Sequence, residues 1–117
     1  MEYVLGVVAR MEKAFENFLR DCGKERKTTF FADLTIAELM GGSKAVKETY
    51  NRVIRAGGSD VEYMSEFVIC LNQKIWQHHK NDRNLALVYN DLWMACDDYC
   101  YKHFKGKDLE YYIRYID

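Results

Sequence analysis

The apolar residues between positions 61 and 79 recur every three or four places, which is the spacing of one face of an α-helix. The main stripe consists of Val61, Met64, Val68, Leu71 and Ile75. A second apolar set widens this stripe until little polar surface remains: Phe67, Ile69, Cys70 and Trp76. The pattern therefore predicts a buried helix at the centre of the molecule.

This central helix has a predicted start and a predicted partner. Ser59 and Glu62 have the spacing of a capping box, and Asp60 adds a negative charge that suits a first helical turn. A second helix is predicted from about residue 84 to 104, after a cluster of Asn and Asp residues. Its apolar side is expected to include Leu85, Val88, Leu92, Ala95 and Tyr99, with Tyr89, Trp93, Cys96 and Cys100 close beside them. Because the connection is only about four residues long, segments 60–80 and 84–104 should form an antiparallel hairpin.

A further amphipathic helix is predicted over residues 2–22, where apolar residues alternate in steps of four and three and Gly23 follows. Its narrow seam consists of Val4, Val8, Met11, Phe15, Phe18 and Cys22. Such a seam can pack against a neighbouring helix of the same chain or against its own copy in a homodimer. The sequence leaves both alternatives open.

Shorter elements complete the pattern. Residues 24–34 are expected to be a charged connection followed by two aromatic residues in a loop, and Thr35 with Glu38 matches a capping box for a short helix ending at Gly41 and Gly42. Another helix should run from about 43 to 55. The last helix, 109–116, should place four residues on one shared face: Leu109, Tyr112, Ile113 and Ile116.

Composition supports a helical globular protein. The chain of 117 residues has no proline, and 49% of its residues are hydrophobic and 30% charged. No repeat, linker or low-complexity tract divides it. We therefore predict an all-α fold: one domain over 1–117, built as a bundle of four principal helices with one or two short ones.

Charge and targeting signals restrict the partners. Seventeen basic and eighteen acidic residues give a formal charge of -1, so no protein-wide field attracts nucleic acid or an anionic membrane. The N-terminal apolar run lacks the pattern of a secretory signal, and no run approaches the roughly 20 residues of a membrane helix. We expect a cytoplasmic protein with no membrane partner, in which the four cysteines are free thiols.

The candidate catalytic and metal-binding residues are not expected to come together at one site. Cys96, Cys100 and His103 share a helical face, and His78 and His79 precede the hairpin turn. In the predicted hairpin His103 lies roughly 30 Å from His79, so the histidines cannot share an ion. The hairpin also places Cys70 near Cys96, which we interpret as two core residues. No nucleotide, phosphate or hydrolase motif occurs, so we predict no cofactor, no metal and no catalysis.

Residues 35–55 resemble a helix-turn-helix, because Gly41 follows Ala37 at the spacing of the turn. Four basic residues would be available for phosphates: Lys44, Lys47, Arg52 and Arg55. Gly42 and Lys47 stand where the motif favours apolar residues, so a helical corner explains the pattern as well. DNA binding by this segment is retained as the alternative function.

Tyrosines concentrate towards the C-terminus. A tyrosine combines apolar area with a hydroxyl group that tolerates water, which suits a protein-contact surface. The candidate contact residues are Tyr101, Tyr111, Tyr112 and Tyr115. The function predicted first is therefore binding to another protein or to a second copy of this chain.

Two blocks, 34–53 and 87–117, resemble short uncharacterised helical proteins carried on phages and conjugative elements of gut bacteria. The likeness covers less than half of the chain. It is carried by Thr35-Ile36-Ala37-Glu38, Thr49-Tyr50-Asn51-Arg52, Tyr89-Asn90-Asp91-Leu92-Trp93 and Lys105-Gly106-Lys107-Asp108-Leu109-Glu110-Tyr111. The resemblance implies a mobile genetic element as the source and brings no activity or residue roles with it.

Overall fold

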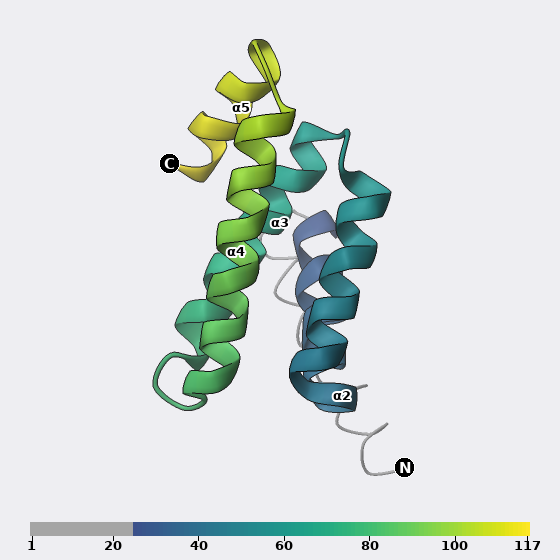
Figure 1. Ribbon diagram of the computed structural model, residues 1–117, viewed down its shortest axis with the longest axis vertical. Helices are drawn as coiled ribbons and strands as arrows, with labels where there is room; N and C mark the ends of the chain where they lie inside the picture. Colours follow the sequence, from purple (N-terminus) through teal and green to yellow (C-terminus); the bar gives the residue numbers. More distant parts are fainter. Residues whose placement is uncertain (1–24) are drawn as a thin grey trace. The chain divides into compact units, whose positions relative to one another are not determined.

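The structure, a computed structural model, describes residues 25–117, and these form helices with no strand among them (Figure 1). In chain order the helices are α2 (Glu25–Gly57), α3 (Val61–His78), α4 (Arg83–His103) and α5 (Lys107–Ile116). The predicted all-α helical bundle is confirmed. The helix predicted over 2–22 lies outside the described residues.

The contacts within the chain divide it into two compact units, Met1–Tyr50 and Asn51–Asp117. The first unit contains the greater part of α2. The second unit contains the end of α2 together with α3, α4 and α5. The single domain over 1–117 stays a prediction.

Helix α2 begins well before the predicted position. Residues 25–34, expected to be a loop, are helical. Thr35, expected to cap a new helix, lies inside α2, where its Oγ1 donates a hydrogen bond to the carbonyl oxygen of Phe31 at 2.8 Å. The capping prediction is wrong because a threonine hydroxyl can also bond to the carbonyl four residues earlier in a continuing helix.

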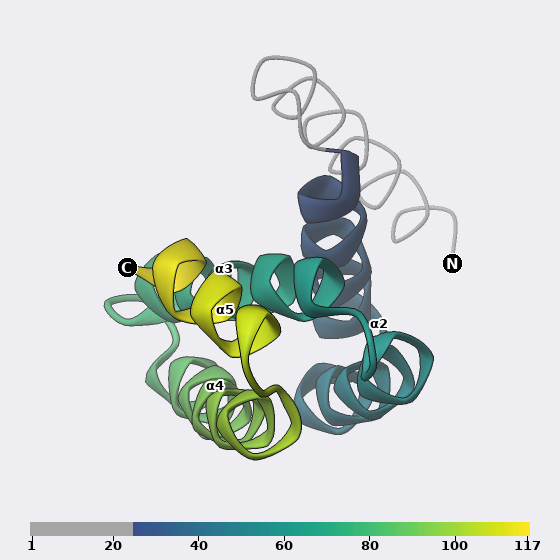
Figure 2. The ribbon, with the colours of Figure 1, turned by 90° about the horizontal axis from the view of Figure 1, so that it is seen from above.

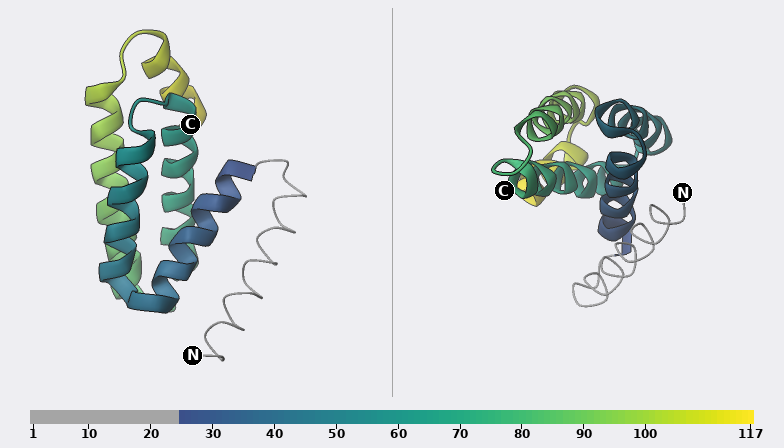
Figure 3. Two further views of the ribbon diagram at one scale, coloured as in Figure 1. Left: turned by 90° about the vertical axis from the view of Figure 1, so that its right-hand side faces the viewer. Right: turned by 90° about the horizontal axis from the view of Figure 1, so that it is seen from below.

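Gly42 interrupts α2. Its φ of 60° and ψ of -144° are not helical, and a residue without a Cβ atom adopts such angles at little cost. The predicted stop at Gly41 and Gly42 is therefore confirmed as a sharp bend, after which the helix resumes and ends at Gly57 (Figure 3).

The antiparallel hairpin of α3 and α4 is confirmed, and the two helices pack against each other (Figure 1). Asp60, and not Ser59, caps α3: its Oδ1 accepts a hydrogen bond from the backbone N–H of Tyr63 at 3.0 Å. Asp82 caps α4 in the same way, with the N–H of Leu85 at 3.1 Å. Each capping carboxylate satisfies a backbone donor that the first helical turn leaves open.

The core of the second unit is built from all three of its complete helices. Large apolar side chains buried in its helices include Met64, Phe67, Val68, Leu71, Tyr89, Leu92 and Tyr112. Two predictions about the hairpin are wrong: Trp76 is 66% exposed, and Ala95 is exposed as well. The face of α4 that turns inward is the one with Tyr89, Cys96 and Cys100.

The turn between α2 and α3 is held against α4. The hydroxyl of Tyr99 donates to the carbonyl oxygen of Gly58 at 3.0 Å. The ring of Tyr63 lies so close to Gly57 that a Cβ atom there would meet it at 1.9 Å, so only glycine fits at this point. Between residues 25 and 117, no helix has the length and apolar character needed to cross a lipid bilayer.

Candidate protein-contact surface

Helix α5 follows a reversal of the chain at Gly106, whose φ of 62° favours glycine. Asp108 and Glu110 lie in the first turn of α5 and Arg114 in the last, where each charge is stabilised by the helix dipole. The helix contacts both α3 and α4 (Figure 2). It therefore has one face against the hairpin and one face turned away from it.

Tyr112 attaches α5 to the hairpin. Its side chain is fully buried, and its hydroxyl donates to Oδ1 of Asp97 on α4 at 2.5 Å. Its ring meets the ring of Tyr101 edge to face, with 5.7 Å between the centroids. Burial and the hydrogen bond to Asp97 raise the pKa of the Tyr112 hydroxyl well above its usual value. Tyr112 is thus a core residue, and its predicted place on a contact surface is wrong.

Two buried thiols lie beside this contact. Cys96 and Cys100, one turn apart on α4, are hydrogen-bonded to each other, and this bond together with burial raises the pKa of Cys96. The same bond lowers the pKa of Cys100, because it favours the thiolate form there. The partner found for Cys96 is therefore on its own helix. The predicted proximity of Cys96 to Cys70 stays a prediction, although both residues are buried.

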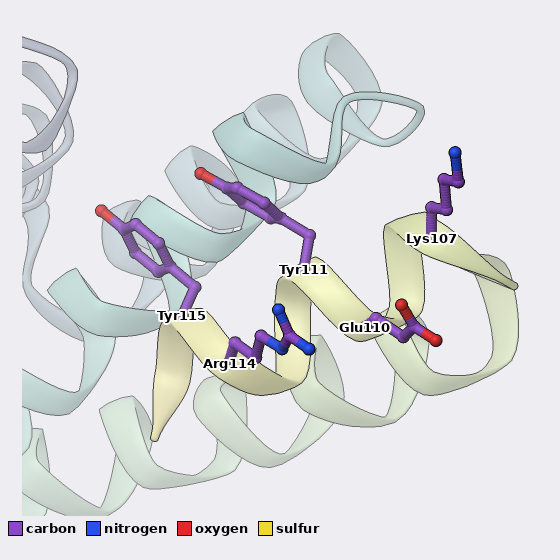
Figure 4. A pocket seen from close by; sticks show the side chains of 5 residues that line it. All are labelled: Lys107, Glu110, Tyr111, Arg114 and Tyr115. Carbon is purple, nitrogen blue, oxygen red and sulfur yellow. The ribbon is translucent and has the colours of Figure 1, made fainter.

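The outer face of α5 carries the other two tyrosines of that helix. The rings of Tyr111 and Tyr115 are stacked, with 5.8 Å between the centroids and 20° between the planes. They line an open depression of about 460 Å³ together with Lys107, Glu110 and Arg114 (Figure 4). Figure 4 shows the two rings projecting in the same direction. Tyr111 is 38% exposed and Tyr101, across the Tyr112 contact, is 47% exposed.

A second open depression lies between α3 and α4 near the hairpin turn. It has a volume of about 340 Å³ and is lined by Ile75, His79, Arg83, Ala86, Leu87 and Asn90. Leu87 is 52% exposed, and Met94, two turns along α4, is 57% exposed. Sequence reasoning missed this surface. The available signal was the seven-residue spacing of Leu87, Met94 and Tyr101, which places them on one side of α4.

The four basic residues of the DNA-binding alternative are all exposed. Lys44, Lys47, Arg52 and Arg55 follow the bend at Gly42 and share one side of α2 by their helical spacing. Glu48 lies on the same side, four residues after Lys44 and four before Arg52, and it places a negative charge among them. The Nε of Arg55 donates to the carbonyl oxygen of Asn51 at 3.3 Å.

The histidines have separate structural surroundings. The ring of His78 stacks on Tyr89 with 5.8 Å between centroids, and Nδ1 of His79 lies 2.8 Å from the carbonyl oxygen of Trp76. His103 stacks on Tyr99 at 5.0 Å. Within residues 25–117, His, Cys, Asp and Glu side chains form no group of three or more that could hold a metal ion.

Comparison with known proteins adds no relative: no protein-family model, no curated protein and no solved structure matches this chain. The function must therefore be inferred from the surfaces themselves.

Proposed function

We propose that this protein binds a segment of another protein on the outer face of α5, which carries Tyr111 and Tyr115. The stacked pair of tyrosine rings beside an open depression supports this proposal most directly. Tyrosine is enriched at protein interfaces because a rigid ring buries much apolar area at a small entropic cost.

The charges around the tyrosines define the partner's chemistry. Lys107 and Arg114 contribute two positive charges to the lining of the depression, and Glu110 contributes one negative charge. A matching segment has an apolar side chain that lies against the two rings and a carboxylate that reaches the Arg114 guanidinium, which can hold it through two hydrogen bonds. The proposed ligand is therefore a peptide segment with an apolar residue and a nearby acidic residue.

The fully buried attachment of α5 and its outer face involve different residues. Tyr112 supplies the buried contact of α5, whereas the residues that line the depression are exposed or half-buried. Replacing Tyr111 and Tyr115 should therefore remove binding and leave the helix in place. This separation makes the proposal testable by mutation.

The test is a selection of peptides from a random displayed library with the full-length protein. We expect enriched peptides that contain an apolar residue close to an acidic one. Their affinity should fall at least about tenfold in a variant with both Tyr111→Ala and Tyr115→Ala, because truncating interface anchors of this kind typically costs more than 1 kcal/mol. The control is Met40→Ala, which removes another exposed apolar side chain, 58% exposed. Equal binding to the double variant, or no enrichment, would contradict the proposal.

Binding to duplex DNA is the second candidate, and one observation favours it: four exposed cations follow a sharp bend between two helical segments. If they contact phosphates, changing Lys44, Lys47, Arg52 and Arg55 to Ala should weaken binding to a 20-base-pair duplex, chosen as roughly two turns, and flatten its salt dependence. Fluorescence anisotropy at several salt concentrations measures both quantities. Binding that is unchanged in this variant would exclude DNA contact by these residues.

A further inference from the structure

One side of α4 carries a row of residues that alternate in steps of four and three, which we call the outer stripe. It consists of Arg83, Leu87, Asn90, Met94, Asp97 and Tyr101. This is the spacing with which one helix faces another along a shared seam. At one end of the stripe α5 already serves as that neighbour, because Tyr112 contacts both Asp97 and Tyr101.

The other end of the outer stripe is open. Leu87 and Met94 are both more than half exposed, and Leu87 lines the depression between α3 and α4. Its other lining residues include Ile75 of α3, His79 directly after α3, and Ala86 of α4. Exposed large apolar residues at seam spacing beside a depression are typical of an interface with another helix.

We propose that a second copy of this chain covers the open end, with the two α4 helices antiparallel about a two-fold axis between Asn90 and Asp91. In this register Met94 of the second copy lies opposite Leu87 and reaches the depression. By symmetry, Leu87 of the second copy lies opposite Met94. Each copy thus buries an exposed apolar side chain of the other, as an isologous interface requires.

The pairing of Arg83 with Asp98 supports this register. The same two-fold axis places Asp98 of the second copy opposite Arg83, so two symmetric ion pairs flank the apolar centre. Both residues are exposed, and the ion pair that Asp98 makes with Lys102 at 3.0 Å is itself solvent-exposed. An exposed pair of this kind is worth little and can be exchanged for a new one. At the axis, Asn90 can donate to the carboxylate of Asp91 in the second copy.

The alternative orientation lacks this match. A parallel pair would place each residue of the stripe opposite its own copy, so that Arg83 would face Arg83 and Asp98 would face Asp98. Like charges held opposite each other oppose association and suppress the wrong arrangement. The interface proposed here shares no residue with the outer face of α5, so it stands or falls independently of the peptide-binding proposal.

The first test measures the mass of the full-length protein by sedimentation over a wide concentration range. The wild-type mass should rise from 13.9 kDa towards twice that value. Arg83→Glu and Asp98→Arg should each weaken association by about tenfold or more, because each creates two repulsive pairs. The variant with both changes should recover most of the wild-type association.

These variants should keep the fold, since both positions are exposed and Glu at the start of α4 suits the helix dipole. A wild-type mass of one chain at every concentration would overturn the proposal. So would a doubly changed variant that associates no better than the single ones.

A second test fixes the position of the interface. Asn90→Cys lies next to the proposed axis and should form a disulfide between position 90 of both copies on mild oxidation, whereas Ala95→Cys, on another side of α4, should not. Peptide mapping by mass spectrometry identifies the linked positions. A link from position 90 to Cys22 of the same chain would show that the N-terminal segment occupies the surface and would overturn the proposal, as would equal linking at position 95.

Discussion

The two ends of the outer stripe of α4 differ in what covers them. At the C-terminal end, Tyr112 of α5 is fully buried and bonded to Asp97, and its ring meets Tyr101. Towards the N-terminal end, Leu87 and Met94 are exposed, and Leu87 lines a depression. One helical surface thus shows a completed contact and an open one. Helix α5 thus covers the stripe at its C-terminal end, whereas Leu87 and Met94 remain exposed towards its N-terminal end.

The largest effect is expected at the covered end. Tyr112→Ala should lower the free energy of unfolding by about 3–5 kcal/mol, because it removes a buried aromatic ring and leaves a cavity between α4 and α5. Urea unfolding followed by circular dichroism measures this loss. Tyr111→Ala, on the outer face of the same helix, is the control and should change stability by far less. Equal losses in both variants would mean that α5 is not held by Tyr112.

A smaller loss of stability is expected when only the hydroxyl group of Tyr112 is removed and the ring is kept. Tyr112→Phe keeps the ring and removes only the hydrogen bond to Asp97, so we expect a loss of about 1.5–3 kcal/mol, the usual range for a hydrogen bond to a charged group. The same unfolding measurement applies. A Tyr112→Phe variant as stable as the wild type would show that packing alone attaches α5.

Tyr112 at the covered end should also make the stability of the protein depend on pH in the alkaline range. The pKa of Tyr112 is raised in the folded state, so the fold keeps the hydroxyl protonated while an unfolded tyrosine loses its proton above about pH 10. The contribution of Tyr112 to the free energy of unfolding is therefore fully present below pH 10. Above pH 10 this contribution falls by up to about 1.4 kcal/mol per pH unit. Comparison with Tyr112→Phe isolates this contribution from that of the other tyrosines. Identical pH profiles would contradict the assignment.

The smallest effect is expected at the open end. At concentrations too low for association, Leu87→Gln and Met94→Gln should each change the free energy of unfolding by no more than about 0.5 kcal/mol, because these side chains are largely in water already. Leu92→Ala, a buried change on the same helix, should cost about 2–5 kcal/mol. A large loss from either glutamine variant would place Leu87 or Met94 in the core.

The architecture of the hairpin was predictable because periodicity, turn residues and capping residues agreed with one another. The Asn and Asp cluster before α4 contained the actual cap, Asp82, and the start of α3 was displaced only from Ser59 to Asp60. The start of α2 was not predictable in this way. Thr35 has hydrogen-bonding options both at a helix start and inside a helix, and the sequence did not distinguish them.

The candidate contact surface was also predictable in part and not in full. The helical pattern of α5 placed Tyr112 on the inner face with Leu109, Ile113 and Ile116, whereas the count of tyrosines placed it outside; the structure agrees with the pattern. Pattern is more informative because it reports direction, and composition does not. The exposure of Leu87 and Met94 depends on how the helices pack in three dimensions, which the spacing of residues along one helix does not report.

The most direct test of the open end as an interface between two copies uses the protein's own methionines. Met94 and Met40 are similarly exposed, at 57% and 58%, and hydrogen peroxide oxidises exposed methionine to the sulfoxide. Mass spectrometry can follow both rates at low and high protein concentration. We predict that oxidation of Met94 slows severalfold as concentration rises while that of Met40 does not change. A Met94 rate that is the same at all concentrations would contradict the proposed interface.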